Sequence, residues 1–267
     1  MRRLIGFDCV GAEAGAALDD APGSTGLLFV SGGSQTRIGS HRMAERLAAT
    51  LAEAGYPCFR FDRRGVGDSA GEDPGFRGSS QDITAAAFAF RREAPQVEHM
   101  FGLGLCDGAA ALALYGAQAG LSGLVLLNPW LVEAEENAPA PAAIRAHYRD
   151  RLLSLDGWKR LLTGGVKLGK LLGGLRKASD TKGSPLASEI AASLRAGDLP
   201  TEVILSRGDA TAAAAAAELK SSQFSGLIGH VHTISSDSHT FARPGDAESL
   251  RAAALAAVRR LEEQVLQ

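Results

Sequence analysis

The sequence predicts an α/β protein with a mostly parallel central sheet and helices on both faces of that sheet. The first observation is a series of short apolar runs, typical of buried strands, which are separated by amphipathic and Ala-rich segments. The second is the regular alternation of these two kinds of segment, as in parallel sheets connected by helices. The third is size: 267 residues, 45% hydrophobic and 22% charged, suit one large soluble domain.

The predicted elements alternate along most of the chain. Strands are expected at 3–10, 26–30, 57–62, 97–103, 123–129, 201–209 and in the segment from 230 to 241. Helices are expected at 41–54, 82–92, 109–119, 210–219 and 246–265.

One long stretch interrupts this alternation. Residues 130–197 begin with acids and prolines and continue with basic amphipathic pieces such as GWKRLLTGGVKLGKLLGGLRK. We expect a small helical cap, or lid, inserted into a single domain that spans 1–267. Its basic face is either a solvated helix surface or a contact for a membrane or an anionic partner.

Composition excludes several classes of function. The net charge of −2 does not favour a nucleic-acid partner. Cys9, Cys58 and Cys106 are too few and too scattered for a disulfide framework or a Cys-rich zinc site, so a reducing compartment is expected. Asp8 interrupts the amino-terminal apolar run before a signal-peptide core forms, and no run approaches the roughly 20 residues of a membrane span. We expect a cytoplasmic protein with no transmembrane segment.

The stretch from Gly104 to Gly108, GLCDG, has the G-x-S-x-G spacing of a nucleophile elbow, with sulfur in place of oxygen. The alternative is that Cys106 is a small buried apolar residue. A predicted strand before it and a predicted helix after it place the thiol at a helix N-terminus, where the helix dipole favours an anion. This context favours a nucleophile.

A thiol nucleophile needs a base, and the base needs an acid that orients it. Of the six histidines, His239 lies just past the last predicted strand, where strand ends converge on the ligand crevice of an open α/β sheet. Asp209 ends the preceding strand, and the order Cys106, Asp209, His239 is the nucleophile–acid–His order of a known hydrolase fold. Asp209 could instead cap a helix, and Asp237 is a competing acid.

The turn Ser31-Gly32-Gly33-Ser34 follows a predicted strand upstream of the elbow. An oxyanion hole needs a backbone N–H from such a loop in addition to the N–H of the residue after the nucleophile, here Asp107. Gly33 or Ser34 is the expected source, and a plain glycine turn is the alternative.

Three basic residues follow this turn. Arg37, His41 and Arg42 either form a pocket for an anionic substrate or cap and solvate a helix. The sequence does not decide between these two interpretations.

Taken together, Ser31–Ser34, FDRRGVGDSAG at 61–71, GLCDG, SRGD and SHTF resemble the α/β-hydrolase superfamily over nearly the whole chain. GSQTRIGSHR at 33–42, with the 61–71 motif and the elbow, is similar to the bacterial hydrolases associated with exosortase A and PEP-CTERM sorting. That likeness implies an association with a protein-sorting or polysaccharide system. The cysteine resembles that of dienelactone hydrolases, Cys-His-Asp members of the superfamily.

The resemblance and the residues together predict hydrolysis of carboxylic esters or thioesters through an acyl-Cys106 intermediate, with no cofactor and no metal. An acyltransferase with the same triad and an inactive binding module are alternatives. A metal site remains a further rival, because His230 and His232 point to the same face of a strand near Asp237 and His239.

Overall fold

The computed structural model describes residues 1–133 and 184–266. Residues 1–132 and those from 185 onward belong to one compact unit, described here by itself. The helices and strands of this unit follow the predicted alternation closely.

An eight-stranded sheet forms the centre of this unit, with strand order β1-β2-β4-β3-β5-β6-β7-β8. Its strands are β1 (Arg2–Cys9), β2 (Ala12–Asp19), β3 (Thr25–Val30), β4 (Cys58–Phe61), β5 (His99–Leu105), β6 (Gly123–Leu127), β7 (Thr201–Ser206) and β8 (His230–Ile234). The strands from β4 to β8 in this order are parallel, whereas β1 and β2 form an antiparallel hairpin. The carboxyl ends of the parallel strands therefore meet at one edge of the sheet.

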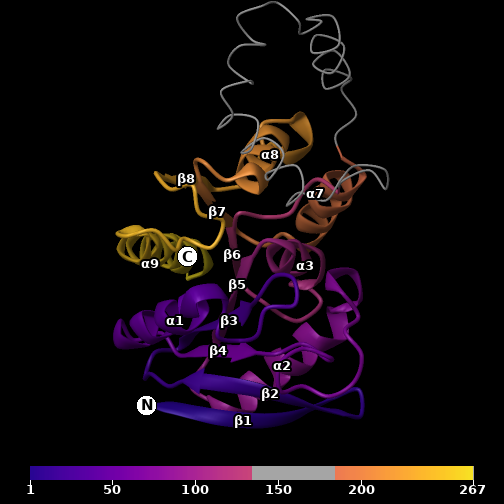
Figure 1. The fold of residues 1–267 in the computed structure, drawn as a ribbon, viewed down its shortest axis with the longest axis vertical. Coiled ribbons are helices and arrows are strands. Elements are labelled where there is room, and N and C mark those ends of the chain that lie inside the picture. Colours follow the sequence, from indigo (N-terminus) through magenta and orange to yellow (C-terminus); the bar gives the residue numbers. More distant parts are fainter. Residues whose placement is uncertain (134–183, 267) are drawn as a thin grey trace, which may run out of the picture. The chain divides into compact units, whose positions relative to one another are not determined.

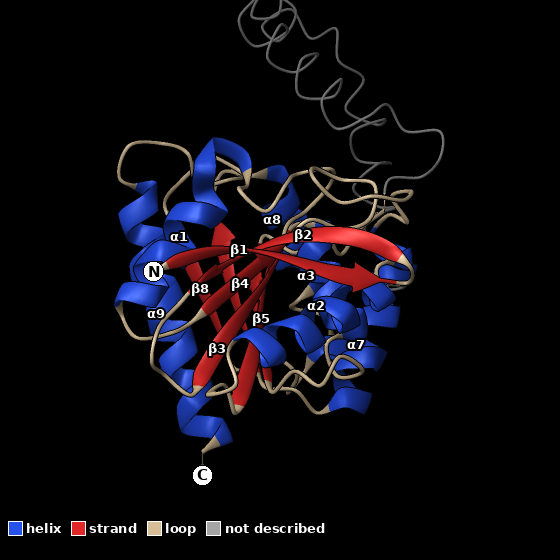
Figure 2. Ribbon diagram, turned by 90° about the horizontal axis from the view of Figure 1, so that it is seen from below, coloured by secondary structure: helices blue, strands red, loops and turns tan. Residues whose placement is uncertain are grey.

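Helices cover both faces of the sheet, which Figure 2 shows as twisted red strands between blue helices. In Figure 1, α1 (Met43–Glu53) and α9 (Asp246–Val265) lie on one side, and α2 (Ser80–Glu93), α3 (Asp107–Tyr115) and α7 (Pro185–Gly197) on the other. The apolar side of α8 (Ala210–Glu218) joins the core of α2, α3 and α7, while α1 and α9 enclose a second core. The fold class is as predicted.

The sequence prediction missed β2. Its residues, AEAGAALD, are mostly alanine and glycine, which are depleted in strands, so local propensity does not indicate extended structure. β2 is extended because it pairs with β1. Val10 and Gly11 turn the chain with positive φ, and every residue of β1 then pairs with one of β2.

The predicted insertion 130–197 extends too far at its carboxyl end. Residues Pro185–Gly197 form α7, whose Leu186 and Ile190 are fully buried in the core of the compact unit. The Ser193 hydroxyl donates to the carbonyl of Leu114 in α3 over 2.8 Å. Residues 134–183 lie outside the described residues, so the expected cap stays a prediction.

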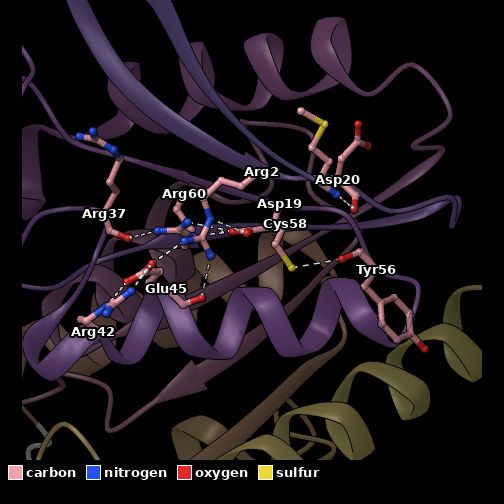
Figure 3. A network of polar contacts seen from close by, with 10 residues as sticks. Arg2, Asp19, Asp20, Arg37, Arg42, Glu45, Tyr56, Cys58 and Arg60 are labelled. Atoms are coloured by element: carbon pink, nitrogen blue, oxygen red, sulfur yellow. Dashed lines mark hydrogen bonds and ion pairs between the residues drawn. The ribbon is translucent and has the colours of Figure 1, made fainter.

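A buried ion pair links β2 and β4, as Figure 3 shows. Arg60 is 1% exposed and Asp19 is 5% exposed, and Nε and Nη2 of Arg60 both donate to Oδ2 of Asp19, over 3.2 and 2.8 Å. Arg2 donates to the other oxygen of Asp19 over 2.7 Å. Arg60 also donates to the backbone carbonyl of Arg37 over 2.7 Å, and so ties the sheet to the loop that follows β3.

Replacing Asp19 with alanine is expected to lower the free energy of unfolding by about 3–5 kcal/mol, because the Arg60 guanidinium would stay buried without its partner. Urea denaturation monitored by circular dichroism measures the loss. Asp237→Ala is the matched control, because it breaks an exposed bidentate pair with Arg243 and should leave stability near that of the wild type. Equal losses in the two variants would contradict the prediction.

Candidate active site

Cys106 lies in a sharp turn between β5 and α3, with φ 59° and ψ −123°. Its N–H donates to the carbonyl of Leu127 and its carbonyl accepts from the N–H of Trp130, both over 3.0 Å. Positive φ is unfavourable for a residue with a side chain, and these bonds to the end of β6 hold the turn in place. The half-buried thiol is thereby presented at the carboxyl edge of the sheet.

The glycines of the elbow are required by close packing. A Cβ at Gly108 would lie 2.5 Å from the carbonyl oxygen of Val30, and one at Gly104 would lie 2.9 Å from the backbone nitrogen of Ala109. Neither contact is tolerable, because the opposing atoms belong to the backbone. The G-x-C-x-G spacing is thus a steric requirement of this strand–turn–helix junction.

His239 and Asp209 converge on Cys106 from the ends of β8 and β7. The Nδ1 atom of His239 lies 3.0 Å from an Oδ2 oxygen of Asp209, whose side chain is 2% exposed. Because Nδ1 is held by Asp209, Nε2 is the nitrogen left for the Cys106 thiol, which lies close enough to the imidazole to raise the pKa of His239. The structure therefore brings together the three residues predicted as nucleophile, base and acid.

Asp209 makes the contacts expected for both interpretations that the sequence left open. The same Oδ2 that contacts His239 also accepts from the N–H of Ala212 over 2.9 Å and so caps the N-terminus of α8. Asp237, the competing acid, pairs with Arg243 at the surface instead. The capping bond fixes the carboxylate that faces the imidazole.

The pKa of His239 is raised from 6.5 to about 9. Burial acts in the opposite direction, because it disfavours the imidazolium, but it is outweighed by the hydrogen bond that the imidazole donates to Asp209, by the nearby Cys106 sulfur and by the charges of both groups. Near neutral pH the histidine therefore carries a proton.

A second layer of polar residues, which the sequence prediction missed, holds the histidine loop. Asn128, fully buried after β6, donates to the carbonyl of His239 over 2.8 Å and accepts from the N–H of Ser206 over the same distance. The Ser206 hydroxyl contacts the carbonyls of Ser236 and Ser238. The only signal for Asn128 in the sequence is that it is a lone polar residue at the end of an apolar run, and such a residue is common where an ordinary strand ends.

The loop after β3 packs directly against the elbow. A Cβ at Gly32 would lie 2.9 Å from that of Cys106, so only glycine allows this approach. The N–H of Gly33, an expected oxyanion donor, instead donates to an Oδ1 oxygen of Asp107 over 2.5 Å. Ser34 is exposed in the same turn. The sequence predicted a role only for the backbone N–H of Asp107. In the structure its carboxylate also accepts the N–H of Gly33, so that expected oxyanion donor is already hydrogen-bonded.

Arg63, another residue that the sequence prediction did not assign, lies under this loop. It is 5% exposed, and its guanidinium donates to the carbonyl of Gly33. Of the buried side-chain nitrogens and oxygens described, its Nη1 is the one without a hydrogen-bond partner. The Gly33 residue is thus held by Asp107 at its N–H and by Arg63 at its carbonyl.

The three basic residues predicted to bind an anionic substrate do not form one pocket. Arg37 pairs with Asp62 and Asp68, and Arg42 pairs bidentately with Glu45, as Figure 3 shows for Arg42. These two guanidiniums are engaged in holding loops together, which favours the structural alternative. His41 is exposed and lines a separate cavity.

The rival metal site is not formed by the part of the chain that the structure describes. The rings of His230 and His232 lie 6.5 Å apart on β8, and within residues 1–133 and 184–266 no three His, Cys, Asp or Glu side chains gather as a metal site would require. None of the helices within these ranges is long and apolar enough to cross a membrane.

Strand order, elbow and site geometry together define the chain as an α/β-hydrolase fold. Residues 27–158, just under half of the chain, match the hydrolase family described as serine aminopeptidase, S33. That family name refers to serine, whereas this elbow carries Cys106. No curated protein sequence matches the chain.

Solved structures share the fold at low sequence identity. An esterase from Pyrococcus furiosus superposes with a TM-score of 0.66 at 13% identity, over 97% of this chain and 92% of that one. Est1E from Butyrivibrio proteoclasticus, solved with ferulic acid, gives 0.63 at 16%, over 98% and 100%. The thioesterase domain from the curacin biosynthetic pathway gives 0.60 at 14%, over 96% and 99%. At these identities the likeness is one of fold.

Proposed function

We propose that this protein hydrolyses carboxylic esters or thioesters through an acyl-Cys106 intermediate. The observation that carries the proposal is the aligned series of Cys106, His239 and Asp209, with the thiol at a strained elbow and the histidine held at 3.0 Å by a buried carboxylate. The esterases and the thioesterase domain of the same fold support this class of reaction.

In the acylation step, the sulfur of Cys106 attacks the carbonyl carbon while His239 holds the proton from the thiol. The carbonyl π electrons move onto oxygen, and backbone N–H groups of Asp107 and the Gly33 loop stabilise that charge. The adduct then collapses, the bond to the leaving group breaks, and the imidazolium donates its proton to the departing alkoxide or thiolate.

In the deacylation step, His239 takes a proton from water, and the resulting hydroxide attacks the thioester carbonyl. The C–S bond breaks, the acid leaves, and the sulfur departs as a thiolate beside the imidazolium that holds the proton from water. Asp209 keeps the ring orientation throughout and stabilises its positive charge. An amine or thiol in place of water would give acyl transfer, which is the second candidate because a thioester reacts readily with such acceptors.

The cellular setting belongs to the proposal as well. The resemblance of the 33–42 and 61–71 motifs supports an association with a protein-sorting or polysaccharide system, with a small acylated molecule as substrate. Three free cysteines suit the reducing environment of the cytoplasm.

Alkylation by iodoacetamide tests the nucleophile without a known substrate. Cys106 should be modified first in the native protein, because burial raises the pKa of Cys9 to about 11 and raises that of Cys58 as well. Mass spectrometry of peptides after timed quenching gives the rate for each cysteine. His239→Ala should slow modification of Cys106, whereas His230→Ala, which removes an exposed histidine of β8, should not.

Two results would contradict the proposal. One is modification of Cys106 at a rate no greater than that of Cys9 and Cys58, with small reagents as well as with iodoacetamide. The other is an equal rate in the wild type and in His239→Ala, because the thiol would then not depend on the imidazole.

A further inference from the structure

A cavity of about 140 Å³ lies beside the histidine loop, between one side of α1 and the amino-terminal half of α9. These two helices are neighbours on one side of the sheet (Figure 1). Met43, Leu47 and Leu250 line it with apolar groups, and residues 240–243, which directly follow His239, form another wall. One wall of the cavity is therefore formed by the residues that directly follow the candidate base in the sequence.

Basic side chains surround this cavity. Arg46 comes from α1, Arg251 from α9 and Arg243 from the histidine loop, and His41 precedes α1. Over the described ranges, the side chains of Arg46 and Arg251 make neither an ion pair nor a hydrogen bond. Cations that line a cavity without partners are suited to bind an anion.

The first turns of two helices also contribute to the lining of the cavity. Met43 and Ala247, in the first turns of α1 and α9, belong to its lining. Neither helix has a side-chain cap at its N-terminus. The first N–H groups of a helix carry partial positive charge, so both helices add to the attraction for an anion.

The acidic groups around the cavity are mostly engaged elsewhere. Glu45 pairs with Arg2 and Arg42, and Asp246 accepts from the Ser236 hydroxyl and the backbone N–H of Arg243. Asp237 pairs with Arg243 of the lining and offsets its charge, so the excess positive charge rests on Arg46 and Arg251. Glu248 is exposed in the first turn of α9. Positive charge therefore exceeds negative charge at the cavity itself.

We propose that this cavity binds the phosphate group of a phosphorylated ligand. A space of about 140 Å³ is below the roughly 300–1,000 Å³ of pockets that enclose whole small molecules, so it suits a compact group. Arginine guanidiniums and helix N-termini are the groups that bind phosphate oxygens in proteins. The phosphate could be free, or it could belong to an acyl donor whose carbonyl reaches Cys106; the latter source rests on the proposed function.

Inorganic phosphate tests the site independently of catalysis. Titration of the Cys106→Ala protein, followed by ³¹P line broadening at constant ionic strength, should show saturable binding. Addition of the exposed substitutions Arg46→Ala and Arg251→Ala should weaken that binding at least about tenfold. Arg259→Ala, which removes an arginine two turns further along α9 and outside the cavity lining, is the matched control.

The site is disproved if phosphate does not bind, or if it binds the Arg46→Ala/Arg251→Ala protein as well as the protein that retains both arginines. Thermal melts of each variant check that the fold is retained, so a loss of binding can be assigned to the removed charges.

A second arm distinguishes the two sources of phosphate. With Cys106 intact, kcat/KM is compared for the acetyl thioesters of pantetheine and of its 4′-phosphate. A preference for the phosphorylated thioester of about tenfold or more, lost in Arg46→Ala/Arg251→Ala, assigns the site to the acyl donor. Equal values, with phosphate binding intact, assign it to free phosphate and contradict the acyl-donor source. Absence of turnover with both thioesters counts against the proposed function rather than against the site.

Discussion

Cys106→Ala is expected to lower kcat for a carboxylic thioester on the order of 10⁶-fold. The loss follows from the covalent role proposed for the sulfur, since the remaining His239 and Asp209 would have no nucleophile to activate. Cys106→Ser should retain only slight activity, because the histidine would have to remove a proton from a much weaker acid. Steady-state release of thiol measures both variants.

The pKa of His239 provides a second test of the Cys106→Ala variant. Because Cys106 helps to raise the pKa of His239 to about 9, the Cys106→Ala protein should show a lower value, which titration of the imidazole by NMR measures. In the wild type, turnover should fall as pH rises through about 9, where the imidazolium that protonates the leaving group is lost. Full turnover in Cys106→Ala would contradict the scheme.

Removing the carboxylate of Asp107 is expected to increase activity toward small uncharged esters. In the structure this carboxylate accepts the Gly33 N–H over 2.5 Å, so a carbonyl oxygen must displace a charged acceptor before it can use that donor. The negative charge also opposes the oxyanion that forms beside it. Asp107→Ala should therefore raise kcat/KM about tenfold, the equivalent of about 1.4 kcal/mol.

The comparison uses p-nitrophenyl acetate with Asp107→Ala, Asp107→Asn and Asp237→Asn. Asp107→Asn keeps the shape but loses the charge, so its gain should be smaller than that of alanine. Asp237→Asn removes a surface carboxylate that faces Arg243 and should change little. A fall in kcat/KM for both Asp107 variants would mean that this carboxylate assists the reaction, which would overturn the prediction.

Much of the fold could be predicted from the sequence, because the signals are local. The apolar run before Gly104 and the Ala-rich segment after Gly108 indicate a strand and a helix directly. The residues of β2 carry no such signal, since alanine and glycine favour a strand only where a partner is already in place. The end of the predicted insertion was wrong for a related reason: the amphipathic pattern of α7 does not tell which core it packs against.

In the candidate site, too, some residues could be predicted from the sequence and some contacts could not. Cys106, Asp209 and His239 could be found because each follows a strand in a parallel sheet, and parallel strands bring their carboxyl ends to one edge. The contact between Asp107 and Gly33 and the two hydrogen bonds of Asn128 depend on side-chain directions across different loops. A linear pattern of residue types contains no information about these directions.

The conformation of the elbow does not depend on the atom that makes residue 106 reactive. Its positive φ is held by backbone bonds to Leu127 and Trp130 and by the space that Gly104 and Gly108 leave, none of which involves the sulfur. Exchange between serine and cysteine at this position therefore requires no change of scaffold. Within an evolving lineage, the reacting atom can therefore change by a single substitution, and the base and the oxyanion donors can adapt to it later while the architecture persists.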